Sequence, residues 1–204
     1  MTLKALALNC TLKPSSEPSS TALLLREVLK ALEAEGVSGG EIIHVADHDI
    51  KPGVTSDEGD GDAWPDIRRQ ILDAQIIVLG TPIWLGQPSS LCKRVLERCD
   101  AFLSEKDEEG RMVSYGRVAM VAVVGNEDGA HHVSAELYQA LNDVGFTIPA
   151  SAVTYWVGEA MGKINYQDLK TPRDAVVSAT KMAARNAAHV AKLLQTSSYP
   201  GEKK

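Results

Sequence analysis

Residues 75–90 read QIIVLGTPIWLGQPSS, an uninterrupted apolar run followed by a Thr-Pro turn. Continuous hydrophobicity over residues 76–79 is typical of a strand that is buried on both faces of a parallel sheet. The turn is followed by Ile-Trp-Leu at 83–85 and then by Gly86. Three large apolar side chains at a strand end predict either an apolar wall for a planar ring or a contact with a loop or a second subunit.

The same kind of apolar run recurs along the chain. Together with residues 75–80, predicted strands lie at 3–9, 42–45, 117–124 and 151–156. Most of the segments between and after them repeat apolar residues at helical spacing, namely 25–32, 92–103, 133–144 and 173–195. Alternation of strands and helices predicts an α/β fold with helices on both faces of a parallel sheet. We expect one domain over residues 1–195 and a polar tail over 196–204.

Composition and charge exclude several classes of protein. The 204 residues carry a net charge of −6, which argues against binding to a nucleic-acid backbone. The sequence has no apolar stretch of membrane-spanning length and no signal-peptide pattern, so we expect no membrane partner. Its three cysteines, Cys10, Cys92 and Cys99, form neither a zinc pattern nor a disulfide framework, which indicates a reducing, cytoplasmic setting.

Two features remain without a metal or catalytic assignment. The acidic segment 47–62 lacks the ligand spacing and the closing Glu of a calcium loop, and we interpret it as a solvated loop. We predict no metal site and assign no catalytic side chain. A role of His131 or His132 in proton transfer stays open.

The loop after the first strand has the composition of a phosphate site. Ligands of an open parallel sheet bind beyond the carboxyl ends of its strands. Residues 9–21, NCTLKPSSEPSST, carry six hydroxyls and a lysine into the start of a helix. Helix N-termini attract phosphate, whereas N-capping by serine would explain only one of these hydroxyls. The candidate phosphate ligands are Thr11, Lys13, Ser19, Ser20 and Thr21.

The loop after the fourth strand, GNEDGAHHV at 125–133, contains two glycines that permit a tight turn. Three loops therefore meet at one edge of the predicted sheet: a phosphate cradle, an apolar wall and a glycine-flanked turn. A ligand with a phosphate at one end and a planar heterocycle at the other matches this set, and flavin mononucleotide (FMN) fits that description.

From Leu3 to about Leu194 the chain resembles the flavodoxin-like NAD(P)H-dependent FMN reductase and quinone reductase superfamily. TPIWLGQPSS is similar to the family's most specific segment, and Thr11 and Lys13 match the Ser and Arg of its first loop. Lysine gives a point charge where arginine would give a bidentate fork. The resemblance implies a three-layer sandwich with a five-stranded parallel sheet in the order 2-1-3-4-5. It also implies that the flavin ring contacts Pro82, Ile83, Trp84, Leu85, Gly86, Gly125, Asn126, Asp128 and Gly129.

By the same resemblance we expect an FMN-dependent oxidoreductase that uses NADH or NADPH. It would pass electrons to a quinone, free flavin or similar acceptor by a ping-pong mechanism, and it would be a homodimer or homotetramer. A flavodoxin-type electron carrier and a flavin-free regulatory domain of the same fold are the alternatives. The long first loop and the segment 155–171 favour the reductase. Residues 155–162 have no assigned family role, and they would either cover the site or form a subunit contact.

Overall fold

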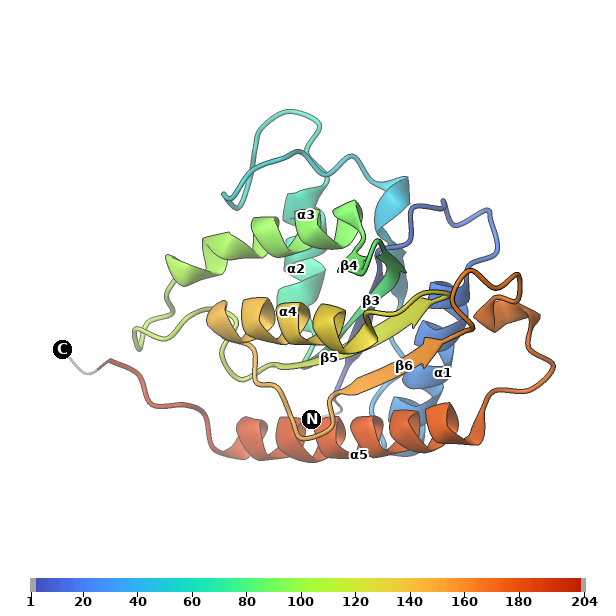
Figure 1. The fold of residues 1–204 in the computed structure, drawn as a ribbon. Helices are drawn as coiled ribbons and strands as arrows, with labels where there is room; N and C mark the ends of the chain where they lie inside the picture. Colours follow the sequence, from blue (N-terminus) through green and yellow to red (C-terminus); the bar gives the residue numbers. More distant parts are fainter. Residues whose placement is uncertain (1–2, 203–204) are drawn as a thin grey trace.

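A parallel sheet runs through the middle of the protein, whose computed structural model describes residues 3–202 (Figure 1). Its strands, in spatial order, are β2 (Ile42–His44), β1 (Ala5–Asn9), β3 (Ile76–Trp84), β5 (Val118–Gly125) and β6 (Val153–Val157). Each neighbouring pair is parallel. The predicted flavodoxin-like fold, with its order 2-1-3-4-5, is confirmed for these strands. The two-residue β4 (Gln87–Pro88), which pairs antiparallel with the end of β3, was not predicted.

The unbroken hydrophobicity of the strands is explained by two cores, one on each face of the sheet. Neighbouring residues of β1 point alternately into them: Leu6 and Leu8 into one, Ala5 and Ala7 into the other. Strand alternation sends successive side chains to opposite faces, so a strand with a core on both sides needs apolar residues throughout.

Helices cover both faces of the sheet (Figure 1). One face packs against α1 (Ser20–Ala34) and α5 (Asp174–Thr196), and the other against α2 (Trp64–Asp73), α3 (Ser90–Cys99) and α4 (Ala130–Asp143). Short 3-10 turns lie at η1 (Val45–Asp47), η2 (Asp100–Leu103) and η3 (Tyr166–Asp168). Among residues 3–202, no helix has the length and apolar character needed to cross a membrane.

Two helices differ from the sequence expectation. The helix expected over 92–103 ends at Cys99 and continues as the 3-10 turn η2. Helix α2 was not predicted, because only Trp64, Ile67 and Ile71 of its ten residues are buried and the rest are largely polar. The signals that could have found it are the proline in its first turn and the four-residue spacing of the two isoleucines.

The acidic segment 47–62 is anchored more firmly than a solvated loop. Asp62 lies at its end with a fully buried side chain, 2.7 Å from the guanidinium of the equally buried Arg98 of α3. Arg98 also donates hydrogen bonds to the carbonyl oxygens of Lys51 and Thr55. Burial opposes ionisation of Asp62, but Arg98 and backbone N–H groups outweigh it and lower the pKa of Asp62 to about 2.

Candidate functional site

A cavity of about 500 Å³ lies at the carboxyl ends of β1, β3 and β5, where the winding of the sheet reverses. All three predicted loops contribute to it. From the sequence-predicted set, the structure brings together Thr11, Lys13, Ser19, Ser20, Thr21, Pro82, Ile83, Trp84, Leu85, Gly125 and Asn126 around this cavity. The other three predicted residues, Gly86, Asp128 and Gly129, lie in the same loops but do not line it.

The first loop presents donors at one end of the cavity. Ser19 is the N-cap of α1 and its Oγ accepts the Ala22 N–H at 3.3 Å. The N–H groups of Ser20 and Thr21 precede the first intrahelical bonds, so they are free to bind a ligand. Lys13 Nζ donates to the carbonyl of Pro18 at 3.2 Å, which holds the ammonium near the helix start. This end is therefore suited to a phosphate.

The loop is also fixed from outside. The Asp47 carboxylate accepts the Ser15 N–H at 3.0 Å. Hydrogen bonds from the side chain and the N–H of Ser15 lower the pKa of Asp47. Cys10, directly after β1, is fully buried, and burial raises the pKa of its thiol. A thiol that stays protonated is a poor nucleophile. The first loop is therefore held in place by Asp47, and Cys10 lies buried directly after β1 as a protonated thiol.

The end of β3 forms the apolar part of the cavity together with Leu85. The turn expected at Thr81 and Pro82 is not present, because both residues pair with β5 and the strand continues to Trp84. Ile83 is buried, whereas Trp84 is 54% exposed and Leu85 is 92% exposed. Leu85 has a φ of 53° and Gly86 a φ of 75°, so the backbone turns sharply into β4 with the two large side chains left uncovered. Exposed aromatic and aliphatic side chains beside a cavity favour a planar apolar ligand.

The loops after β3 and β5 are held together at this end. Glu127 Oε1 accepts the N–H of Leu85 at 3.0 Å. A Cβ at Gly129, whose φ is 127°, would lie 3.0 Å from the Cα of Gly86. The absence of a side chain at Gly86 and Gly129 thus lets the two loops pack closely against each other, although neither glycine lines the cavity.

The histidines lie outside the lining of this cavity. His131 Nε2 is 3.0 Å from the hydroxyl of Tyr155. His132 Nε2 is 2.9 Å from Nε2 of Gln87 and 3.3 Å from a carboxylate oxygen of Glu136. Neither contact brings a histidine into the cavity.

A fourth wall comes from the segment after β6, where the sequence offered a cover for the site as one of two readings of residues 155–162 but assigned no site residue. It is tied to Asn126, whose Nδ2 donates to Asn165 Oδ1 at 3.1 Å and to the Gly162 carbonyl at 3.3 Å. The signal that could have indicated an ordered turn is the pair Asn165 and Asp168, which forms a capping box at η3. The cavity residues missed are Val124, Glu127, Met161, Gly162, Asn165 and Gln167.

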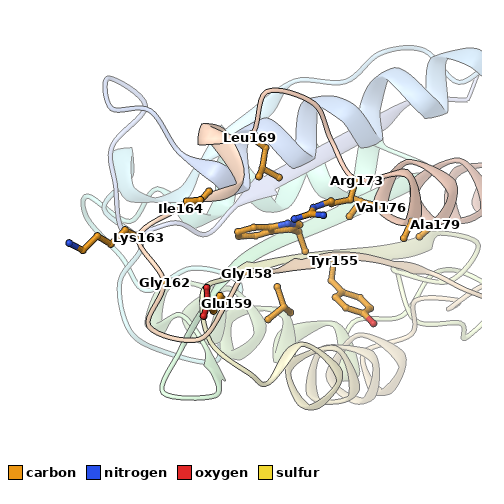
Figure 2. Close-up of a pocket in the computed structure, with 13 residues that line it drawn as sticks. Tyr155, Gly158, Glu159, Gly162, Lys163, Ile164, Leu169, Arg173, Val176 and Ala179 are labelled. Carbon is orange, nitrogen blue, oxygen red and sulfur yellow. The ribbon is translucent and has the colours of Figure 1, made fainter.

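A second cavity of about 740 Å³ is lined by residues of β6 and of the segment after it, and Gly162 lines both cavities (Figure 2). Arg173 points into that second cavity, whereas the ammonium of Lys163 points away from it (Figure 2). None of the sequence-predicted site residues lines the larger cavity. We therefore place the candidate site in the smaller one, which combines the strand ends, a helix N-terminus and the apolar wall.

The residues around the smaller cavity fit FMN. Lys13 and the start of α1 match its phosphate, and the exposed Trp84 and Leu85 match its ring. Gln167 also lines the cavity, beside Ser20 at the start of α1, but its Oε1 is buried and has no hydrogen-bond partner in the described part of the chain.

Comparisons with known proteins point in the same direction. The family model for NADPH-dependent FMN reductases matches residues 3–161. The 8-demethyl-8-aminoriboflavin-5'-phosphate synthase of Streptomyces davaonensis is 32% identical over 209 residues, covering 98% of this chain and 81% of the synthase. The crystal structure of RosB with bound 8-demethyl-8-formylriboflavin-5'-phosphate matches with a TM-score of 0.88 and 32% identity, covering 97% of this chain and 82% of RosB.

A further relative is much longer than this chain. The divalent metal cation transporter MntH of Mycobacterium bovis is 37% identical over 200 residues, which cover 95% of this chain. The chain spans only 29% of the length of that protein.

Proposed function

This chain belongs to the NADPH-dependent FMN reductase family, which binds FMN and uses NAD(P)H, and we propose that it passes electrons from NADH or NADPH to a quinone, free flavin or similar small acceptor by a ping-pong mechanism. The observation that carries the proposal is the cavity at the strand ends. It is lined on one part by hydrogen-bond donors suited to a phosphate and on another by exposed apolar side chains. When bound, FMN supplies the chemistry, because its ring accepts a hydride and passes electrons on.

The protein's own part is binding and positioning. Lys13 and the N–H groups at the start of α1 would hold the phosphate. Trp84 and Leu85 would cover one face of the ring, and Gly125 would let the backbone come close to it. No side chain is needed as nucleophile or general base in this reaction, in keeping with histidines that lie outside the cavity lining.

Assembly and location are part of the proposal. Trp84, Leu85 and Met161 are exposed apolar residues around the cavity. Covering them with a second subunit would shield the ring from water, so we propose a homodimer or homotetramer. A cytoplasmic location agrees with the free, buried thiols of Cys10, Cys92 and Cys99.

A second candidate function is chemical modification of the flavin itself. It is favoured by the likeness to RosB, whose structure holds an 8-formyl derivative of riboflavin phosphate and matches nearly the whole of this chain. In that case FMN would be a substrate and not a resident cofactor, and the same cavity would bind it.

One experiment separates the two candidates. The protein is incubated with FMN, NADPH and a soluble benzoquinone while the absorbance of NADPH is followed. The flavin is then released from the protein, and its mass is measured by mass spectrometry. Sustained NADPH oxidation with a flavin of unchanged mass supports the reductase. A flavin of altered mass, or no oxidation above a protein-free control, would overturn it.

A further inference from the structure

One edge of the sheet is open in the part of the chain that the structure describes. Strand β6 comes last in the order β2-β1-β3-β5-β6 and pairs there with β5 alone. The carbonyl of Ala152 accepts an N–H of β5, and the Gly158 N–H donates to a carbonyl of β5, each at 2.9 Å. Backbone groups alternate in direction along a strand, so those of Val153, Tyr155 and Val157 point away from β5. Within residues 3–202 these outward groups form no backbone hydrogen bond to another segment.

The sequence of β6 does not protect this edge. Proteins usually blunt an exposed edge with a charged side chain, a proline, a bulge or a very short strand. Strand β6 reads VTYWV over residues 153–157, without a charge or a proline, and consists of residue types that favour strands. At the opposite edge of the sheet, β2 has three residues only. The edge of β6 is therefore suited to pairing with a further strand.

The cavity of about 740 Å³ lies along this edge (Figure 2). It is lined by the consecutive residues 155–158, although successive side chains of a strand point to opposite faces of a sheet. A cavity that meets all of them lies at the edge of the strand. Apolar walls come from Ile164 and Leu169 of the segment after β6 and from Val176 and Ala179 of α5. Free backbone groups beside apolar walls form a groove for an extended chain.

The charge of this groove indicates what kind of chain it would bind. Its lining contains two basic residues, Lys163 and Arg173, and one acidic residue, Glu159, in a protein whose net charge is −6. Arg173 points into the cavity (Figure 2), and it forms no ion pair among the described residues. An arginine without a partner favours a ligand that carries a carboxylate.

We propose that the open edge of β6 binds an extended acidic segment of a partner protein, which adds a strand to the sheet. The N–H and carbonyl groups of Tyr155 and Val157 pair with its backbone, alternate side chains enter the apolar groove, and Arg173 binds a carboxylate. The groove lies between the segment after β6 and α5, so a single extended chain fits it. The β6 strand of a second copy carries the same two walls, which would have to enter the groove with it. The proposal does not depend on flavin binding.

The test begins with an array of peptides of about six residues, a common strand length. Valine or isoleucine alternates with threonine or serine, and one position is glutamate. The tightest binder is labelled with fluorescein and measured against the whole protein by fluorescence anisotropy. We expect saturable binding, and a version of the peptide with glutamine in place of glutamate should bind about tenfold more weakly.

Two variants test the two parts of the groove. Arg173→Gln should weaken binding of the glutamate peptide about tenfold and leave binding of the glutamine peptide unchanged. Arg185→Gln is the matched control, because Arg185 is exposed on the same helix and does not line this cavity. Val157→Pro removes an N–H that points away from β5, so the sheet keeps its hydrogen bonds while peptide binding falls about tenfold. The thermal unfolding midpoint of each variant establishes that it is folded.

Amide hydrogen exchange, followed by NMR, locates the peptide on the wild-type protein without any substitution. Bound peptide should slow exchange of the outward N–H groups of Tyr155 and Val157. Exchange at Thr154 and Trp156 should not change, because their N–H groups already face β5.

Three results would overturn the proposal. The first is an array without a binder. The second is equal binding of the glutamate peptide to the wild type, Arg173→Gln and Val157→Pro. The third is a wild type that is dimeric and a Val157→Pro variant that is monomeric by light scattering, because a second copy would then occupy the edge.

Discussion

The Arg98–Asp62 pair gives the sharpest prediction about stability. Both side chains are fully buried and 2.7 Å apart, and Arg98 also binds two carbonyl oxygens of the loop 47–62. Replacing Arg98 by Met leaves the buried Asp62 carboxylate without its cation and the carbonyl oxygens of Lys51 and Thr55 without the donor that Arg98 supplies. Breaking a buried pair in this way costs about 3–5 kcal/mol of unfolding free energy. Arg69→Met is the matched control, because Arg69 pairs with Asp66 on the surface and such pairs contribute about 0–1 kcal/mol.

The same pair predicts a dependence on pH. The pKa of Asp62 falls from an ordinary 3.8 to about 2 on folding. The folded state therefore favours the carboxylate, and this stabilisation is complete above pH ~4 and is lost as the pH falls through ~2. A shift of that size corresponds to roughly 2 kcal/mol, most of which is lost at pH ~2.

The assay is urea unfolding followed by tryptophan fluorescence at several pH values. Between pH ~6 and ~2, the wild type should lose about 2 kcal/mol more of its stability than Asp62→Asn loses. Equal pH dependence of the two proteins, or equal costs for Arg98→Met and Arg69→Met, would refute the reasoning that the buried pair anchors this loop.

Three further predictions concern the candidate site. Trp84→Ala should weaken FMN binding about tenfold in a fluorescence titration, because it removes the exposed aromatic wall, and unchanged affinity would contradict that placement. Lys13→Ala should weaken FMN binding but not riboflavin binding, and it should reduce the salt dependence of FMN affinity; equal effects on both flavins would place the phosphate elsewhere. Gly129→Ala should lower the unfolding free energy by about 1–3 kcal/mol, since a Cβ there meets the Gly86 backbone at a φ of 127°; a wild-type denaturation curve would show that the contact is not needed.

Much of the fold could be predicted because local sequence and global structure agree. The strands β1, β3 and β5 are buried on both faces, so their unbroken hydrophobicity identified them directly. Helix α2 escaped because its apolar stripe is short and lies among charged residues. Strand β4 escaped because two residues carry no periodic pattern.

The site divides in the same way. That residues at the ends of β1, β3 and β5 would line one cavity could be predicted, since strand ends of a parallel sheet meet at one edge. The wall formed by the segment after β6 could not, because contacts distant in sequence hold it there. Tyr166 bonds to Glu27, 139 residues earlier, and Gln167 to Ser20, 147 residues earlier. Local spacing contains no trace of such pairs.

The most direct test of the central claim is to saturate the purified protein with added FMN, remove the excess, denature the protein and identify the flavin that it releases. The account predicts the absorption spectrum of a flavoprotein before denaturation. It also predicts release of flavin in a ratio of about one per chain, because residues 3–202 form such a cavity at the strand ends. A colourless protein that retains no FMN would contradict the account, and Trp84 and Leu85 would then have to be explained as a surface that binds another protein.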